Sequence, residues 1–198
     1  MENFAVIILA AGGSSRLGKP KQLLVHDGTS FLEHAVQTAS AIAGENVIVV
    51  LGANAKLVLE QVPALQKLSV INENWKEGMG TSIAIGLESV LDLLPTTTFI
   101  IIMTVDQPSV SSDHLQEMIR VYEQSGKSIV ASTYDDVAGI PALFSHEYFK
   151  DLLNLKTDKG ARDIIRSKDE QVAKIVLPGG EFDIDTPEQY AAFQNKRN

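Results

Sequence analysis

An apolar run joins a glycine-rich, positively charged loop near the amino terminus. Phe4–Leu9 is continuous and rich in branched residues, which is typical of a strand covered on both faces. The loop after it contains three glycines and three basic residues: Gly12, Gly13, Gly18, Arg16, Lys19 and Lys21. Glycines let backbone N–H groups approach phosphate oxygens closely. The loop therefore predicts a polyphosphate site, to which Arg16, Lys19 and Lys21 add fixed positive charge.

Two common phosphate-binding loops do not fit this segment. Residues 13–20 come within one residue of the P-loop pattern, but Pro20 stands where a P-loop needs a hydroxyl for Mg²⁺. The dinucleotide spacing G-x-G-x-x-G is absent, because Gly12 and Gly13 are adjacent and the next glycine is Gly18. The loop is therefore of a third type.

Acidic residues that could hold a metal follow later in the chain. Asp106 comes after the apolar run Phe99–Met103, and Asp183 and Asp185 would face one side of an extended segment. Mg²⁺ accepts one or two carboxylates together with substrate phosphates and water. A structural alternative stays open at this point, since Asp106 could begin a turn before proline and the other two could order a helix start.

A second glycine-containing segment, Gly78–Ser82, stands where a helix is expected to begin. Its amides and the Ser82 hydroxyl would suit a phosphate or a base edge at the helix amino terminus. From these residues alone, a flexible loop with a capping serine is the preferred interpretation.

Alternating patterns predict the elements that position these loops. Apolar runs predict strands at 4–9, 47–51, 68–71, 99–103 and 129–131, and helical periodicity predicts helices at 30–43, 81–94, 112–124, 160–166 and 187–194. We expect Ser112 to cap the third helix, a short strand at 141–144 and a helix at 146–153. The alternation favours a parallel sheet, so the loops after Leu9, Ile71 and Met103 should converge on one cleft.

Composition limits the class of protein. The chain has 198 residues and a net charge of −8, which fits one domain over residues 1–198 and disfavours nucleic-acid binding. It has no cysteine, which excludes disulfides, thiolate metal sites and cysteine nucleophiles. Because the start enters a strand directly and no run approaches twenty apolar residues, we expect a cytoplasmic protein with no membrane partner.

Five short motifs, in order, resemble those of the molybdopterin cytidylyltransferases, a branch of the MobA-like nucleotidyltransferases. They are Leu9–Lys21 (LAAGGSSRLGKPK), Gly78–Ser82 (GMGTS), Asp106–Pro108 (DQP), Asp158–Arg162 (DKGAR) and Asp183–Glu188 (DIDTPE). The resemblance spans residues 5 to about 193, essentially the whole chain. It implies one α/β domain of the nucleotide-diphospho-sugar transferase type, Rossmann-like, with a mixed, mostly parallel sheet and helices on both faces.

The resemblance also implies roles for individual residues. The nucleotide contacts would be Leu9, Ala10, Ala11, Gly12, Arg16, Lys21, Gly80 and Ser82. The catalytic residues would be Arg16, Lys21 and Asp106, and Asp106 with Asp185 would hold Mg²⁺.

The implied reaction transfers CMP from CTP to the terminal phosphate of molybdopterin or the molybdenum cofactor and releases pyrophosphate. The product could pass to a molybdenum hydroxylase that docks on the protein, and Lys159 and Arg162 could bind the acceptor phosphate. Ile140 and Thr157 depart from the family pattern on the acceptor side, whereas Ala11 favours cytosine over guanine. Two alternatives are a sugar- or polyol-phosphate nucleotidyltransferase and a non-catalytic cofactor carrier.

Overall fold

A computed structural model describes residues 3–134, 137–156, 160–180 and 184–195 of the chain. Its main sheet has the strand order β5-β4-β1-β6-β8-β7-β9, with β1 at Phe4–Ala10, β4 at Val47–Leu51, β5 at Ser69–Ile71, β6 at Phe99–Thr104, β7 at Ile129–Tyr134, β8 at Val137–Ser145 and β9 at Val172–Val176. A separate hairpin pairs β2 (Val25–His26) with β3 (Thr29–Ser30). The α-helices are α1 (Phe31–Ala43), α2 (Ala55–Gln61), α3 (Met79–Leu93), α4 (Ser112–Ser125), α5 (Phe149–Leu153), α6 (Ala161–Ser167) and α7 (Pro187–Asn195).

Within this sheet, β8 is the one strand that runs antiparallel to its neighbours, among the described residues. The central strand β1 pairs in parallel with both β4 and β6, so that Ile7 stands beside Ile48 and Ile102. All three of these isoleucines are buried. The predicted α/β fold with a mixed, mostly parallel sheet is confirmed.

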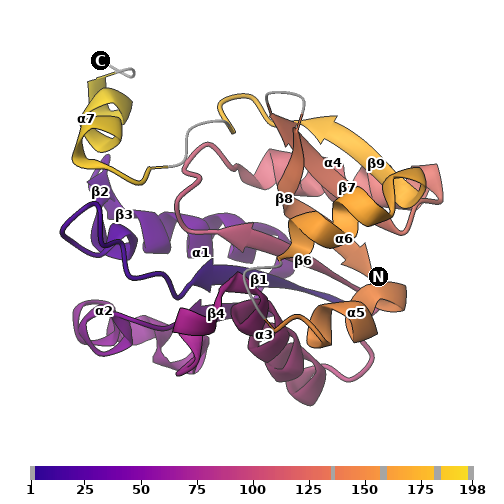
Figure 1. Ribbon diagram of the computed structural model, residues 1–198, viewed down its shortest axis with the longest axis horizontal. Coiled ribbons are helices and arrows are strands. Elements are labelled where there is room, and N and C mark those ends of the chain that lie inside the picture. Colours follow the sequence, from indigo (N-terminus) through magenta and orange to yellow (C-terminus); the bar gives the residue numbers. More distant parts are fainter. Residues whose placement is uncertain (1–2, 135–136, 157–159, 181–183, 196–198) are drawn as a thin grey trace.

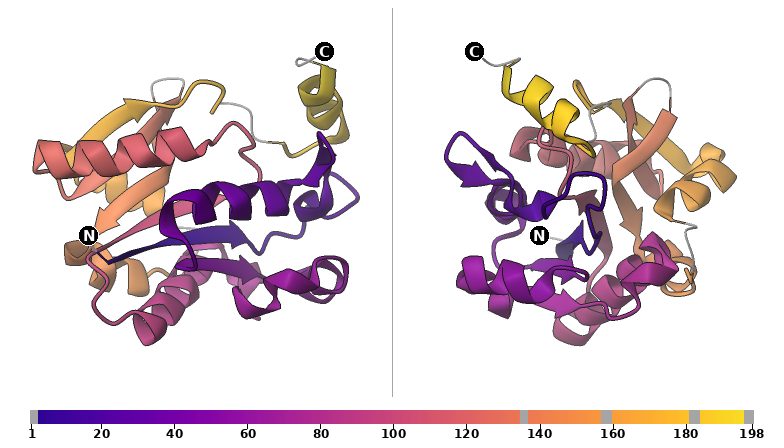
Figure 2. Two further views of the ribbon diagram at one scale, coloured as in Figure 1. Left: turned by 180° about the vertical axis from the view of Figure 1, so that it is seen from behind. Right: turned by 60° about the vertical axis from the view of Figure 1, so that its left-hand side comes forward.

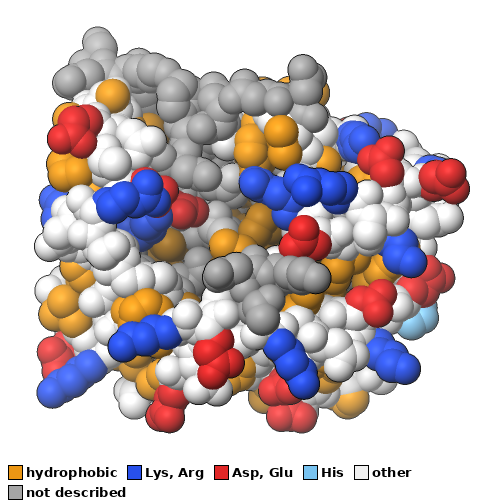
Figure 3. Space-filling model, in the orientation of Figure 1, with side chains coloured by type: hydrophobic (Ala, Val, Ile, Leu, Met, Phe, Trp, Pro, Cys, Tyr) orange, Lys and Arg blue, Asp and Glu red, His pale blue; other side chains and the backbone are white. Residues whose placement is uncertain are grey.

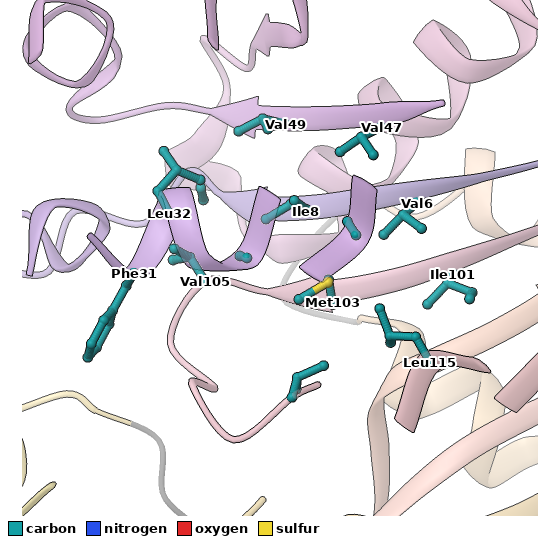
Figure 4. Close-up of a cluster of buried hydrophobic side chains, with 14 of the residues drawn as sticks. Val6, Ile8, Phe31, Leu32, Val47, Val49, Ile101, Met103, Val105 and Leu115 are labelled. Carbon is teal, nitrogen blue, oxygen red and sulfur yellow. The ribbon is translucent and has the colours of Figure 1, made fainter. Parts of the chain in front are cut away.

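Helices cover both faces of the sheet (Figures 1 and 2). One face packs against α1, α2 and α4, and the other packs against α3, α5 and α6. Figure 4 shows the first of these cores, where alternate side chains of β1, β4 and β6 (Val6, Ile8, Val47, Val49, Ile101 and Met103) lie on the side of the sheet that faces Phe31 and Leu32 of α1 and Leu115 of α4. Because both faces are covered, ligands can reach β1 only at its ends.

The structure differs from the predicted elements in several places. The short strand expected at 141–144 is the middle of the longer strand β8, and the helix expected at 146–153 is a 3-10 turn followed by α5. Ser112 is not the cap of α4, because the side chain of Ser111 accepts the His114 N–H. The hairpin, α2 and β9 were not predicted, since each is short or weakly patterned. None of the helices in the described ranges is both long and apolar enough to cross a membrane.

The amino terminus of α1 is fixed by a capping box that the sequence encodes locally. The Glu33 N–H donates to Ser30 Oγ at 3.2 Å, and the Ser30 N–H donates to Glu33 Oε2 at 3.1 Å. Replacing Ser30 by alanine leaves a helical N–H without its acceptor, so we expect Ser30→Ala to lower the free energy of unfolding by about 1 kcal/mol. Thermal unfolding should show a Tm lower by about 2–4 °C.

The matched control is Ser40→Ala in the same helix, which removes a hydroxyl away from the cap and should leave the Tm unchanged or slightly raised. Equal melting of Ser30→Ala and the wild type would show that the box does not stabilise the fold.

Candidate active site

A cavity of about 330 Å³ opens at the carboxyl ends of β1, β5 and β6. It is lined by Leu9, Ala10, Ala11, Gly12, Lys21, Gln22, Trp75, Gly78, Met79, Ser82, Thr104, Val105 and Asp106. The loops after Leu9, Ile71 and Met103 therefore do meet, as parallel strands require. Figure 3 shows this face of the molecule hollowed, with charged and hydrophobic side chains around the hollow.

Two of the eight predicted nucleotide contacts do not line this cavity. Arg16 lies at the rim, where its side chain is 70% exposed and reaches across to the carboxyl-terminal segment. Gly80 is buried in the first turn of α3. Both roles stay predictions, whereas Leu9–Gly12, Lys21 and Ser82 are brought together in one space.

The glycine-rich loop leaves room for a ligand at its start and turns sharply at its end. A Cβ added to Gly12 would meet no atom within 4 Å, so the backbone there faces open space. Gly18 has a φ of +73°, a left-handed conformation that favours glycine. The loop then closes on itself, because the Lys21 N–H donates to Ser14 Oγ at 3.1 Å. This bond fixes the backbone from which the Lys21 side chain projects.

The side chain of Lys21 joins the two candidate metal ligands. Its Nζ lies 2.8 Å from Asp106 Oδ2 and 2.6 Å from Asp185 Oδ1. Arg16 Nη2 lies 2.6 Å from the other oxygen of Asp185. The Lys21 side chain is only 12% exposed. Residues separated by 85 and 164 positions along the sequence thus form one charged cluster.

The contacts within the cluster shift the pKa values of Lys21 and Asp185. Burial opposes the charge of Lys21, but the charge and hydrogen bond of Asp106, together with those of Asp185, outweigh burial and raise the pKa of the ammonium above its ordinary value. The hydrogen bond from Lys21 lowers the pKa of Asp185 against an opposing effect of burial, and the charges of Lys21 and Arg16 add to that lowering. Lys21 and Asp185 are therefore both charged at neutral pH.

The residues present fit a divalent cation of the magnesium type. Carboxylate oxygens of Asp106 and Asp185 converge on the Lys21 ammonium, which occupies the position that a metal ion bound by both carboxylates would take. No group of three or more His, Cys, Asp or Glu side chains able to hold a metal occurs in the part of the chain that the structure describes. Substrate phosphates and water would therefore have to complete the coordination. Asp183, the other candidate, lies outside the described residues.

Three residues that the motifs did not single out shape the cavity. Gln22 is buried, and its Nε2 donates to the carbonyl oxygen of Ala10 at 2.5 Å and of Gly12 at 3.2 Å. Asn72 is also buried, and its Nδ2 donates to the hydroxyls of Thr81 and Ser82, at 2.9 Å each. Both amides fix groups at the mouth of the cavity. Their positions carry no sequence signal beyond a polar residue beside a predicted loop.

The third such residue is Trp75, which forms one wall of the cavity. A Cβ on Gly52 would lie 2.6 Å from the carbonyl oxygen of Ala11 and 2.8 Å from the Cβ of Trp75. Gly52 therefore has to lack a side chain for Trp75 to approach the loop after β1. The tryptophan is the large aromatic surface of this cavity, and aromatic faces stack on nucleobases.

A second cavity of about 330 Å³ adjoins the first. It is lined by Met79, Thr104, Asp106, Gln107, Tyr134, Ile140, Gly160, Ala161, Arg162 and Asp163, and it shares Met79, Thr104 and Asp106 with the first. Arg162 Nη2 donates to the hydroxyl of Tyr134 at 3.1 Å. Asp106 thus stands between two adjoining spaces. Asp158 and Lys159, from the same motif as Arg162, lie outside the described residues, as does Thr157.

Solved structures of similar fold extend over the whole chain. Rv0371c from Mycobacterium tuberculosis H37Rv is 29% identical, with a TM-score of 0.80 and 98% of both chains covered. The same protein has been solved in complex with manganese, with a TM-score of 0.73 and 28% identity.

Two curated proteins are also similar to this chain in sequence. Purine catabolism protein PucB of Bacillus subtilis is 28% identical over 195 residues, which cover 93% of this chain and 92% of PucB. Nicotine blue oxidoreductase of Paenarthrobacter nicotinovorans is 36% identical over 106 residues, so the match spans 53% of this chain and half of that protein.

The family model described as the MobA-like NTP transferase domain matches residues 6–172. That range runs from within β1 to the first residue of β9, and it includes the residues that line both cavities. The chain therefore belongs to the MobA-like nucleotidyltransferase family.

Proposed function

We propose that the protein transfers CMP from CTP to the terminal phosphate of molybdopterin or of the molybdenum cofactor and releases pyrophosphate, in a Mg²⁺-dependent reaction. The observation that carries the proposal is the Lys21–Asp106–Asp185 cluster. Its Asp106 lines both cavities, and its Lys21 lines the first. One cavity would hold the nucleoside triphosphate and the other the acceptor. The α-phosphorus would then lie near Asp106.

In the reaction, an oxygen of the acceptor phosphate bonds to the α-phosphorus, and the bond from that phosphorus to the bridging oxygen of the pyrophosphate breaks. Such a displacement needs positioning and charge stabilisation more than a protein nucleophile. The amides of the loop after β1 would hold the phosphates, and Arg16 and Lys21 would stabilise the charge that grows on pyrophosphate. A divalent metal held by Asp106 and Asp185 would supply further positive charge to the triphosphate.

Asp106 and Asp185 would hold the metal, because their carboxylates already share one cation. The manganese complex of Rv0371c supports a divalent cation in a similar protein. The preference for cytosine rests on Ala11 in the loop after β1. Ser82, whose hydroxyl Asn72 holds, and the ring of Trp75 would bound the base.

The second cavity suits an acceptor that is both apolar and anionic. Ile140, Met79 and the ring of Tyr134 supply apolar surface, and Arg162 supplies a cation. Among the described residues, no carboxylate forms an ion pair with Arg162, so its guanidinium can bind a phosphate. This chemistry matches the ring system and terminal phosphate of molybdopterin.

The central test is pyrophosphate release in a single turnover with each of CTP, GTP, ATP and UTP, with and without Mg²⁺ and molybdopterin. We expect release only with CTP, Mg²⁺ and molybdopterin together. Asp106→Asn should reduce the rate at least about 100-fold, because weaker metal binding leaves the charge on the transferring phosphoryl group less well stabilised. Asp113→Asn, at the exposed start of α4, should not change the rate.

Other outcomes would replace the proposal with a specific alternative. Release with a sugar phosphate or polyol phosphate but not with molybdopterin would assign a different acceptor. Tight binding of the cofactor without release from any triphosphate would assign a carrier.

A second prediction concerns Arg162. If it binds the acceptor phosphate, Arg162→Met should raise the KM for the acceptor at least about tenfold, because a charge-assisted bidentate contact contributes more than 1.4 kcal/mol. The KM for CTP should stay within about twofold of the wild type, since Arg162 does not line the first cavity. Arg166→Met, on an exposed position of the same helix, is the control. Equal changes in both KM values would indicate a general distortion instead.

A further inference from the structure

The Lys21 ammonium occupies the position that the two candidate metal ligands would offer to a cation. It makes hydrogen bonds of 2.8 Å to Asp106 and 2.6 Å to Asp185, so both carboxylates already have a cationic partner within the chain. Arg16 adds a second positive charge at Asp185. A divalent ion that approached these oxygens would meet an ammonium already in contact with them, and like charges at such distances repel strongly.

We propose that Lys21 is an internal counter-ion that excludes a divalent cation from Asp106 and Asp185 until a nucleoside triphosphate offers the ammonium a new partner. This inference rests on the proposed function and goes beyond it, because it assigns Lys21 two positions. In the free protein the ammonium pairs with the carboxylates. With a metal and a triphosphate bound, it pairs with the phosphates.

The geometry allows this exchange without movement of the backbone. The N–H of Lys21 is held by Ser14 Oγ, whereas its side chain lines the cavity that also contains Gly12. The space in front of Gly12 is open, so the phosphates that we place there lie along the same cavity wall as Lys21. The four-carbon stem of lysine has enough rotamers to reach either partner.

A thermodynamic consequence follows. If the metal can bind only when the ammonium leaves, then the triphosphate favours the metal and the metal favours the triphosphate by the same factor. The free protein would bind metal weakly, and the metal–nucleotide complex would be the form that binds well. When no ligand is present, the ammonium would also stabilise the fold, because it places a positive charge beside two partly buried carboxylates.

The test measures Mn²⁺ binding to the full chain by electron paramagnetic resonance of the free ion, without nucleotide. Removing the competing charge should make Lys21→Met bind Mn²⁺ at least about tenfold more tightly than the wild type. A non-hydrolysable CTP analogue chelates Mn²⁺ by itself, so its titration is repeated without protein. Beyond that binding, the analogue should tighten Mn²⁺ binding to the wild type, and it should do so less in Lys21→Met. An activity measurement would not reveal this, because loss of Lys21 lowers the rate in either case.

The matched control is Lys19→Met, which removes a charge from the same loop; Lys19 lies over the ring of Tyr190, with 5.0 Å from its Nζ to the ring centroid. It should leave Mn²⁺ affinity within about twofold of the wild type, which separates a local competition from a general change in charge. Adding Asp106→Asn to Lys21→Met should remove the gain. Lys21→Gln, which keeps a hydrogen-bond donor without charge, is the second variant if Lys21→Met does not fold.

Equal or weaker Mn²⁺ binding by both Lys21 variants would overturn the inference, and so would a gain of the same size in Lys19→Met. These outcomes are independent of the proposed reaction. Pyrophosphate release could still follow if Lys21 does not compete with the metal. Conversely, the Mn²⁺ result could hold in a protein that uses a different acceptor.

Discussion

The ion pairs of Lys21 with Asp106 and Asp185 are the interaction on which the arrangement of the site depends. They join the loop after β1, the loop after β6 and the segment before α7, which are far apart in the sequence. The two carboxylates are 23% and 32% exposed, so each would repel the other if no cation lay between them. One ammonium therefore holds three segments in register around the cavity. A ligand that replaces this ammonium also has to replace its charge.

The sheet makes this cluster possible by fixing where the loops emerge. β1 is flanked by parallel strands and covered on both faces, so its carboxyl end is the exit open to a ligand. The approach of the neighbouring loops depends on Gly52, where any side chain would strike the backbone of Ala11. The buried amide of Gln22 then holds the carbonyls of Ala10 and Gly12. Hydrogen-bonded backbone thus surrounds a long, unbranched lysine side chain, which is the combination that the proposed exchange of partners requires.

The site consists of two adjoining cavities with different linings. The first is formed by the loops of the parallel half, and the second lies between β8, the end of β6 and the start of α6. The family match places the chain among the MobA-like nucleotidyltransferases. In the proposed reaction the acceptor would occupy the second cavity, where Tyr134, Ile140 and Arg162 combine apolar surface with a cation that forms no ion pair among the described residues. Under that proposal, substitutions in the second cavity would change the acceptor and leave the nucleotide chemistry intact.

The sequence by itself determined the parallel strands, most helices and the loop residues of the first cavity, because hydrophobic periodicity and glycine–lysine spacing are local signals. It predicted that Asp106 and Asp185 belong together but not that Lys21 lies between them. It missed β9 and the β2–β3 hairpin, whose short runs gain their stability from neighbouring strands. Gln22, Asn72 and Trp75 acquire their roles only from the backbone groups that other loops bring to them. Tertiary structure decided these points, since contacts between distant segments depend on packing and charge, which no local pattern records.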